Sequence, residues 1–390
     1  MILVKKILMP LVVFTIALNS SLAEAKSEQI PEPARVDLPP PKLTAETWVL
    51  MDFNTGWVLA SKDSNRKIEP ASLSKLMTAY VVFAELRKGT LKLSDLAHVS
   101  KKAWRTGGSR MFIRVNTEVS IENLLKGLII QSGNDAAVAL AEHVAGTEEA
   151  FAERMNQVAK SLGMLNSNFK NATGLPAEDH YSSAHDLSVL AMYIIREFPD
   201  YYKWYSQKEF TYNKITQGNR NLLLYRDETV DGVKTGHTSS AGYCLVGSGV
   251  KNDMRLIATV TGTKSPKIRA REVQSLLKFG HANYESSKVL DGSSAATQIQ
   301  AYKGSGDRVM LGVHDAVYAT VPRGKGKQIK TNLQAPKYVI APIRAGQQIG
   351  NAQVLLGDKI LFTVPLVALA ALPEGGWWQR MIDAVMLWFE

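Results

Sequence analysis

The stretch Pro70-Ala71-Ser72-Leu73-Ser74-Lys75 opens a run whose apolar residues recur at helical spacing. On a helix that begins near Ser72, Ser72 and Lys75 share a face, because residues three apart are neighbours. A serine hydroxyl is a weak nucleophile until a base removes its proton. A lysine one turn away can act as that base when burial and a nearby cation lower its pKa. By itself the pattern is also compatible with a capping serine beside a solvated lysine.

A second polar motif, Ser132-Gly133-Asn134, falls between a predicted helix over 121–130, capped by Ser120, and another that begins near Asp135. A hydroxyl here could relay a proton, and an asparagine amide could hold a substrate carbonyl. Gly133 would permit the tight turn. The alternative is an ordinary loop with a helix cap.

The third motif, Lys234-Thr235-Gly236-His237, precedes two predicted strands over 242–250 and 254–261. At a strand edge it offers a cation, a hydroxyl donor and a glycine that allows close backbone approach, which suits a substrate carboxylate. The alternative is a basic turn that leads into a strand, with His237 structural or solvated.

In this order the motifs S-x-x-K, S-x-N and K-T-G resemble the signature of the penicilloyl serine transferases. The mature chain is similar to the low-molecular-mass penicillin-binding proteins, the serine-type D-alanyl-D-alanine carboxypeptidases (peptidase S11 group) with a C-terminal β domain. The resemblance is carried most specifically by 70–75, 131–136 and 230–238. Segments 171–176 and 180–184 resemble the loop that borders the site of that family.

The resemblance assigns a role to each motif residue. It implies that Ser72 is acylated, that Lys75 is its base and that Ser132 and Lys234 transfer protons. The backbone N–H groups of Ser72 and His237 would form the oxyanion hole. The substrate-binding residues that it implies are Asn134 for the amide, Thr235 for the terminal carboxylate, and Gly236, His237 and Arg220 beside them.

The activity so implied is removal of the terminal D-Ala from peptidoglycan stem pentapeptides, with acylation by β-lactams, in the service of cell-wall synthesis and cell shape. No cofactor or metal is expected, and no His-Glu-x-x-His zinc motif occurs. A class A β-lactamase is disfavoured because no Glu-x-x-Leu-Asn stretch lies between Asn134 and Lys234. A D,D-endopeptidase, a transpeptidase and a structural envelope protein with a vestigial site remain open alternatives.

Composition and the N-terminus bear on class and location. With 45% hydrophobic and 21% charged residues, the 390-residue chain is neither disordered nor collagen-like. A single cysteine, Cys244, excludes a disulfide scaffold, and its apolar surroundings predict a buried side chain. Residues 1–25 hold two lysines, an apolar run and Ala23-Glu24-Ala25, which predicts a signal peptide. The chain is therefore expected outside the cytoplasm, with no nucleic-acid partner, although a signal anchor is an alternative.

The pattern predicts a mixed α/β (α+β) catalytic domain over 43–287, after a proline-rich extended leader over 26–42. Helices are inserted between N- and C-terminal strands of one sheet, a fold class like that of β-lactamases. Short strands at 309–313, 317–321, 338–340, 352–356 and 360–364 predict a small all-β sandwich over 288–373.

The last segment, 374–390, contains a predicted amphipathic helix over 377–390, with three tryptophans and a phenylalanine on its apolar side. Fourteen helical residues reach about 21 Å, which is too short to cross a hydrocarbon core. The helix is expected to attach peripherally to the periplasmic face of the inner membrane. The alternative is a helix that packs on the β domain of the same chain.

Overall fold

The computed structural model describes residues 38–389. The predicted signal peptide and most of the predicted leader therefore lie outside the described residues. The central element is a five-stranded antiparallel sheet in the order β2-β1-β9-β8-β7. Its strands are β1 (Thr47–Asp52), β2 (Val58–Lys62), β7 (Val230–Thr238), β8 (Gly242–Lys251) and β9 (Met254–Thr263). Strands from both ends of the domain thus meet in one sheet, as predicted.

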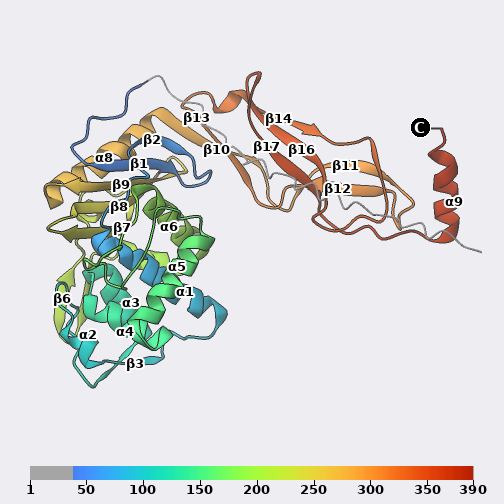
Figure 1. Ribbon diagram of the computed structural model, residues 1–390. Coiled ribbons are helices and arrows are strands. Elements are labelled where there is room, and N and C mark those ends of the chain that lie inside the picture. Colours follow the sequence, from blue (N-terminus) through green and yellow to red (C-terminus); the bar gives the residue numbers. More distant parts are fainter. Residues whose placement is uncertain (1–37, 390) are drawn as a thin grey trace, which may run out of the picture. The chain divides into compact units, whose positions relative to one another are not determined.

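One face of the sheet is covered by α8 (Pro266–Asn283), which packs on β8 and β9 (Figure 1). The other face is covered by α6 (Ala184–Glu197) and by the other helices inserted between β2 and β7. The large core between the sheet and these helices contains the fully buried Leu73, Phe83 and Leu140. Cys244 is fully buried in β8, which confirms its prediction as a small hydrophobic residue.

The insertion between β2 and β7 is mainly helical. Its helical elements are η1 (Ala71–Ser74), α1 (Lys75–Lys88), α2 (Lys101–Arg105), α3 (Ile121–Lys126), the π-helical turn η2 (Gly127–Gln131), α4 (Asn134–Ala145), α5 (Glu148–Ser161), α6 (Ala184–Glu197), α7 (Pro199–Tyr202), η3 (Lys203–Ser206) and η4 (Leu222–Tyr225). Two small hairpins pair β3 (Leu96–His98) with β4 (Glu118–Ser120) and β5 (Glu209–Tyr212) with β6 (Ile215–Gly218). The helix expected over 121–130 is α3 followed by η2, and Ser120 caps it as predicted, accepting from Asn123 N.

The C-terminal domain is built from two β-sheets, which confirms the predicted β class. Its strands are β10 (Tyr284–Leu290), β11 (Ala295–Tyr302), β12 (Arg308–Gly312), β13 (Val317–Pro322), β14 (Ile329–Gln334), β15 (Tyr338–Ile340), β16 (Gln348–Leu356) and β17 (Lys359–Ala368), with a short 3₁₀ turn η5 (Gly326–Gln328). Six form one sheet, and β10 pairs with β13. Strand β10 runs across the expected domain boundary at residue 287.

Three strands of this domain, β10, β11 and β14, have no counterpart among the predicted strands. Their sequences are rich in polar residues, and β14, an edge strand of its sheet, is largely exposed. Such strands lack the apolar runs by which the others are found. The chain continues into helix α9 (Trp377–Met386), which is shorter than the expected 377–390.

Candidate active site

Ser72 lies in η1, directly before the first turn of α1, and is partly exposed. The fold holds this turn from two sides. A Cβ on Gly236 of β7 would come within 3.1 Å of the Pro70 carbonyl oxygen, and one on Gly174 would overlap the Ala71 carbonyl. Glycine at both positions therefore lets a strand and a loop approach the serine-bearing turn closely.

The amine of Lys75 lies beside the Ser72 hydroxyl, with 3.1 Å between Nζ and Oγ. Nζ also lies 2.6 Å from Asn134 Oδ1 and 2.6 Å from the Thr173 carbonyl oxygen. A neutral amine has two N–H donors and one lone pair. The carbonyl groups of Asn134 and Thr173 can only accept, so they take both donors, and the lone pair is directed at the Ser72 hydroxyl. The geometry suits a base that removes the serine proton.

The surroundings of Lys75 favour this neutral form. The side chain is fully buried. Burial, followed by the positive charge of Arg220, lowers the pKa of Lys75 from 10.5 to about 7, while the carboxylates of Asp135 and Glu148 act in the opposite direction.

Ser132 and Lys234 form a second polar pair, with 2.8 Å between Oγ and Nζ. Burial, and then the nearby charges of Lys75, Arg220 and Arg269, lower the pKa of Lys234 well below its usual value. Ser132 itself has φ of 66°, whereas Gly133 has φ of −60°. The expectation that Gly133 provides the turn is therefore wrong. Gly133 instead provides space, since a Cβ there would meet Asp135 Oδ1 at 2.8 Å.

Asn134 contributes through both ends of its amide. Its Oδ1 accepts from Lys75, and its Nδ2 donates to the Gly107 carbonyl at 2.6 Å. The side chain thus connects the base to the loop that precedes Ser109. Asn134 also lines the cavity described below, where one Nδ2 hydrogen stays available for a substrate carbonyl.

Lys234, Thr235, Gly236 and His237 lie within β7, and not in the basic turn that was the alternative. Among residues 38–389, β7 pairs with β8 alone and forms the edge of the sheet, so no strand of this part of the chain lies on its other side. The sequence pattern does not predict this strand, because glycine, lysine and aspartate interrupt it and because apolar and polar residues do not alternate along it.

These residues surround a cavity of about 650 Å³. Seven of the predicted site residues line it: Ser72, Ser132, Asn134, Arg220, Thr235, Gly236 and His237. Lys75 and Lys234 are buried in the wall behind the two serines. His237 is exposed and stacks on Tyr243, with 3.9 Å between ring centroids. The structure therefore brings all nine predicted residues together.

Sequence reasoning missed Arg269 of α8, which lines the cavity and donates to the Gly236 carbonyl oxygen at 2.9 Å. Burial lowers the pKa of Arg269 to about 10. Arg271, two residues further on, looks equivalent in the sequence. Only the packing of α8 on the sheet distinguishes the two arginines.

Asp135 was predicted only as a helix start. Its carboxylate accepts backbone N–H groups of Met111, Phe112 and Ile113, and so fixes the loop that carries Gly108 and Ser109 into the cavity wall. An aspartate at a helix start is common, and no sequence signal announces this long-range contact.

In residues 38–389, no group of three or more His, Cys, Asp and Glu side chains is arranged to hold a metal ion. That the reaction needs no cofactor stays a prediction.

Comparison with known families adds independent information. The peptidase S11 family model, described as D-alanyl-D-alanine carboxypeptidase, matches residues 34–265. A second model, penicillin-binding protein 5, C-terminal domain, matches residues 284–374. The two matched segments contain the cavity-lining motifs and the β domain, respectively.

Similar proteins cover nearly the whole chain. It is 39% identical over 377 residues to D-alanyl-D-alanine carboxypeptidase DacA of Haemophilus influenzae, covering 95% of this chain and 96% of that protein. It is 40% identical to D-alanyl-D-alanine carboxypeptidase DacC of Escherichia coli, covering 90% and 89%. The crystal structure of penicillin binding protein 5 from Haemophilus influenzae superposes with a TM-score of 0.81 at 40% identity, covering 86% of this chain and all of that one. From its motifs, its fold and these matches, the chain belongs to the D-alanyl-D-alanine carboxypeptidase family of serine peptidases.

Proposed function

We propose that this protein removes the terminal D-alanine from peptidoglycan stem pentapeptides through an acyl-ester on Ser72. The observation that carries the proposal is the 3.1 Å contact between Lys75 Nζ and Ser72 Oγ, with the other two amine contacts already satisfied. A neutral Lys75 takes the hydroxyl proton as Oγ attacks the penultimate D-Ala carbonyl. An oxygen–carbon bond forms, and the carbon–nitrogen bond to the terminal D-Ala then breaks.

The remaining groups serve the leaving amine and the developing negative charge. The leaving amine takes a proton from the Ser132 hydroxyl, which Lys234 holds at 2.8 Å. The backbone N–H groups of Ser72 and His237 donate to the oxyanion. Ser72 lies in the first turn of η1, where backbone N–H groups have no partner within the helix. The proton that Lys75 took from Ser72 then returns to Ser132. In the second half of the reaction water attacks the ester and gives a proton to Lys75, and this proton passes to Ser72 Oγ as the ester bond breaks and the shortened peptide leaves. A β-lactam ring would be opened by the same serine.

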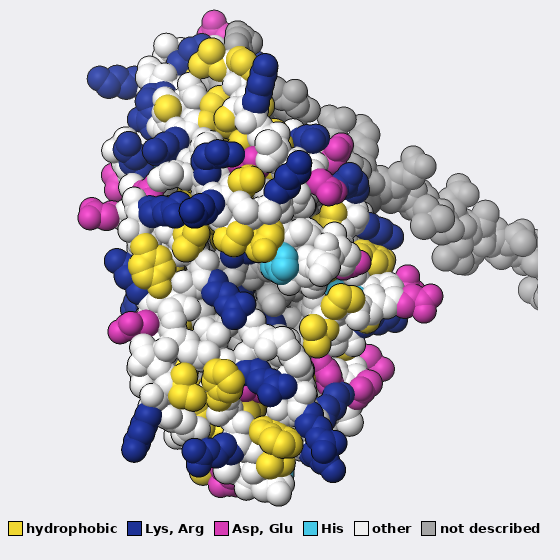
Figure 2. Space-filling model, turned by 90° about the vertical axis from the view of Figure 1, so that its left-hand side faces the viewer, with side chains coloured by type: hydrophobic (Ala, Val, Ile, Leu, Met, Phe, Trp, Pro, Cys, Tyr) yellow, Lys and Arg dark blue, Asp and Glu magenta, His cyan; other side chains and the backbone are white. Residues whose placement is uncertain are grey.

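The charges around the cavity fit a substrate that ends in a carboxylate. Arg220 and Arg269 line the cavity and Lys234 lies behind Thr235. None of the lining residues in the described part of the chain is Asp or Glu. On the side of the molecule where β6 and β7 lie, Lys and Arg side chains outnumber Asp and Glu (Figure 2). Such a surface favours anionic substrates.

The direct test is mass spectrometry of a pentapeptide that ends in D-Ala-D-Ala after incubation with the protein. Loss of one alanine supports the carboxypeptidase. A cross-linked dimer as main product would indicate a transpeptidase, and cleavage only of a cross-linked substrate an endopeptidase. Ser72→Ala should abolish turnover and penicillin labelling, whereas Ser61→Ala, on the exposed end of β2, should leave both unchanged.

We further infer that the protein is exported and attaches to the periplasmic face of the inner membrane through α9. The polar side of α9 contacts its own chain, since Asp383 accepts from the backbone N–H of Lys303 and Arg380 pairs with Glu374. The apolar residues face solvent instead: Trp377 is 61% exposed, Trp388 89% and Phe389 85%. A helix that packs on its own domain would bury its apolar side, whereas α9 exposes it. The exposed apolar side favours insertion into a membrane interface. None of the helices described is long and apolar enough to span a bilayer.

A further inference from the structure

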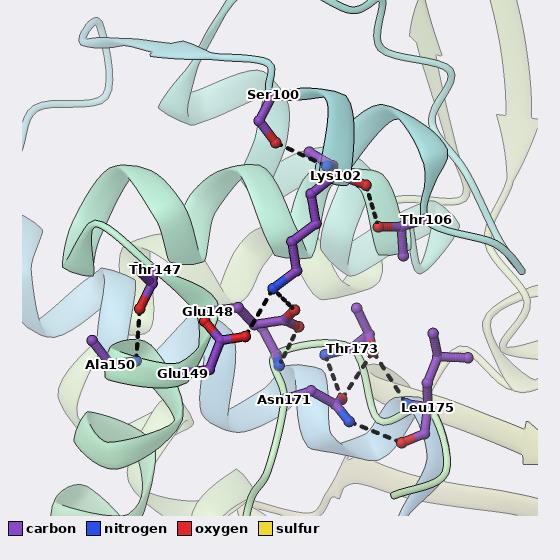
Figure 3. A network of polar contacts seen from close by, with 12 residues as sticks. Ser100, Lys102, Thr106, Thr147, Glu148, Glu149, Ala150, Asn171, Thr173 and Leu175 are labelled. Atoms are coloured by element: carbon purple, nitrogen blue, oxygen red, sulfur yellow. Dashed lines mark hydrogen bonds and ion pairs between the residues drawn. The ribbon is translucent and has the colours of Figure 1, made fainter.

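The loop 171–175, which borders the cavity, is folded around its own side chains (Figure 3). Oδ1 of Asn171 accepts the N–H groups of Thr173 and Gly174, at 3.1 and 2.7 Å, and the Thr173 hydroxyl at 2.9 Å. Its Nδ2 donates to the Leu175 carbonyl at 2.9 Å. This loop presents the Thr173 carbonyl oxygen to Lys75 Nζ.

Both backbone polar groups of Ala172, the residue before Thr173, are held by side chains. On one side, Thr78, one turn beyond Lys75 on α1, donates to the Ala172 carbonyl at 2.7 Å. On the other, the Ala172 N–H donates to Glu148 Oε1 at 3.1 Å. Glu148 is the first residue of α5, and its side chain is buried. Its Oε2 lies 3.0 Å from Lys102 Nζ.

A buried carboxylate is costly unless it is paired and hydrogen-bonded. Glu148 meets that condition through the Ala172 N–H and the Lys102 ammonium. An uncharged acceptor such as glutamine would accept the Ala172 N–H without the cost of burying a charge. The catalytic mechanism derived above uses neither Glu148 nor Lys102.

We propose that the Lys102–Glu148 ion pair is a positioning pair for Lys75, acting through the backbone of Ala172 and Thr173 and through its charge. The proposal rests on the function proposed above. Glu148 fixes the loop whose carbonyl takes one of the two amine donors, so that the lone pair of Lys75 stays directed at Ser72. Lys102, which is half-exposed, partly neutralises Glu148 from the solvent side.

The charge of Glu148 also reaches Lys75. Around Lys75, Asp135 and Glu148 supply negative charge and Arg220 supplies positive charge, while Lys234 is a second buried amine whose own pKa is lowered. Around Glu148 lie Lys102, Lys75 and the neighbouring Glu149. Removing the Glu148 charge therefore favours neutral Lys75 at lower pH, whereas removing the Lys102 charge favours protonated Lys75.

The test is the pH profile of the rate of acylation by a fluorescent penicillin, measured on the full chain. Glu148→Gln keeps an oxygen for the Ala172 N–H but removes the charge. We expect the midpoint of the rise in rate to move to lower pH by about half a unit. Lys102→Met should move it in the opposite direction, and Lys102→Arg should restore the original midpoint.

The matched control is Glu149→Gln. Glu149 also pairs with Lys102, at 3.1 Å, but it is 77% exposed, and its contacts do not include the loop 171–175. The midpoint of the acylation profile of Glu149→Gln should therefore equal that of the unaltered protein. Glu148→Ala, which removes both the charge and the acceptor, should move the midpoint as Glu148→Gln does and should also lower the plateau rate of acylation about tenfold.

Superimposable profiles for Glu148→Gln, Lys102→Met and the unaltered protein would overturn the proposal, and so would equal shifts of the same sign. Thermal unfolding of each variant distinguishes loss of fold from loss of positioning. If Glu148→Ala does not fold, the opposite midpoint shifts of Glu148→Gln and Lys102→Met still test the proposal. Failure of the proposed function looks different. Without an acylated serine the unaltered protein would not be labelled at all, and a transpeptidase or an endopeptidase would be labelled but would give the other peptide products described above.

Discussion

Oγ of Ser132 and Nζ of Lys234 lie 2.8 Å apart, although 102 positions separate the two residues in the chain. Ser132 stands between η2 and α4 in the helical insertion, and Lys234 stands on the edge strand β7. The cavity therefore lies where the insertion meets the sheet. Both side chains are buried, so each depends on the other as a polar partner.

Lys234→Ala should lower the rate of penicillin acylation by about 10²–10⁴, because proton transfer through Ser132 loses its partner. Stopped-flow labelling measures this rate. Lys251→Ala, at the exposed end of β8, is the control and should label normally. Normal labelling of Lys234→Ala would contradict the role given to the pair.

The acylation rate should rise with pH through a midpoint near 7, because burial and Arg220 lower the pKa of Lys75 to about 7. Below that pH, Lys75 is protonated and cannot accept the serine proton, so the rate falls about tenfold per pH unit. Above it, the rate levels off. Initial rates between pH 5 and 9 test this, and a flat profile would show that another group is the base. Lys75→Ala should remain slow throughout.

A pentapeptide with an amidated C-terminus should react about 10–100-fold more slowly than the free acid. Without the carboxylate, Thr235 and the nearby cations lose a partner, at about 1–3 kcal/mol per group. Arg220→Gln should narrow this difference by slowing the free acid more than the amide, with both rates measured at a pH above the acylation midpoint, where Lys75 is neutral. Arg226→Gln, which is exposed and does not line the cavity, should not. Equal kcat/KM for both peptides would refute the carboxylate assignment.

Stability should decrease as the pH falls from about 6.5 to 4, in part because of His180. Its Nε2 lies 2.8 Å from the Oγ of the buried Ser74, and burial lowers its pKa to about 4. Between its unfolded pKa near 6.5 and this value, the unfolded chain binds a proton that the folded chain excludes. The free energy of unfolding should fall on the order of 2 kcal/mol over this range. Urea unfolding of His180→Gln should show a smaller decrease in the free energy of unfolding over the same pH range. If this free energy changes with pH as it does in the unaltered protein, His180 is not the source.

Truncation after Gly376 should give an active protein that no longer sediments with lipid vesicles. Trp388→Ser combined with Phe389→Ser should weaken binding of the full chain, because both rings are exposed. Leu165→Ser, at an apolar residue 83% exposed elsewhere on the molecule, is the matched control. High salt should release little protein, since Arg380 is the only basic residue of 377–390. Equal vesicle binding by the full and truncated chains would exclude α9 as the anchor.

The sequence by itself determined the motif residues, their order and the class of the catalytic domain. Ser72 and Lys75 are three apart at a helix start, so local geometry alone places their side chains together. The runs of apolar residues likewise predicted β8 and β9, because these strands are buried on one face or on both.

Only the tertiary structure decided which distant groups meet around that pair. The Thr173 carbonyl, Arg269 and Glu148 carry no local signal, because a backbone oxygen, a helical arginine and a helix-start glutamate occur in most proteins. Their roles arise when the loop 171–175, α8 and α5 pack against η1, β7 and α1. The same packing excludes water from Lys75 and Lys234, and that desolvation, which spacing cannot reveal, turns two ordinary lysines into amines with strongly lowered pKa values.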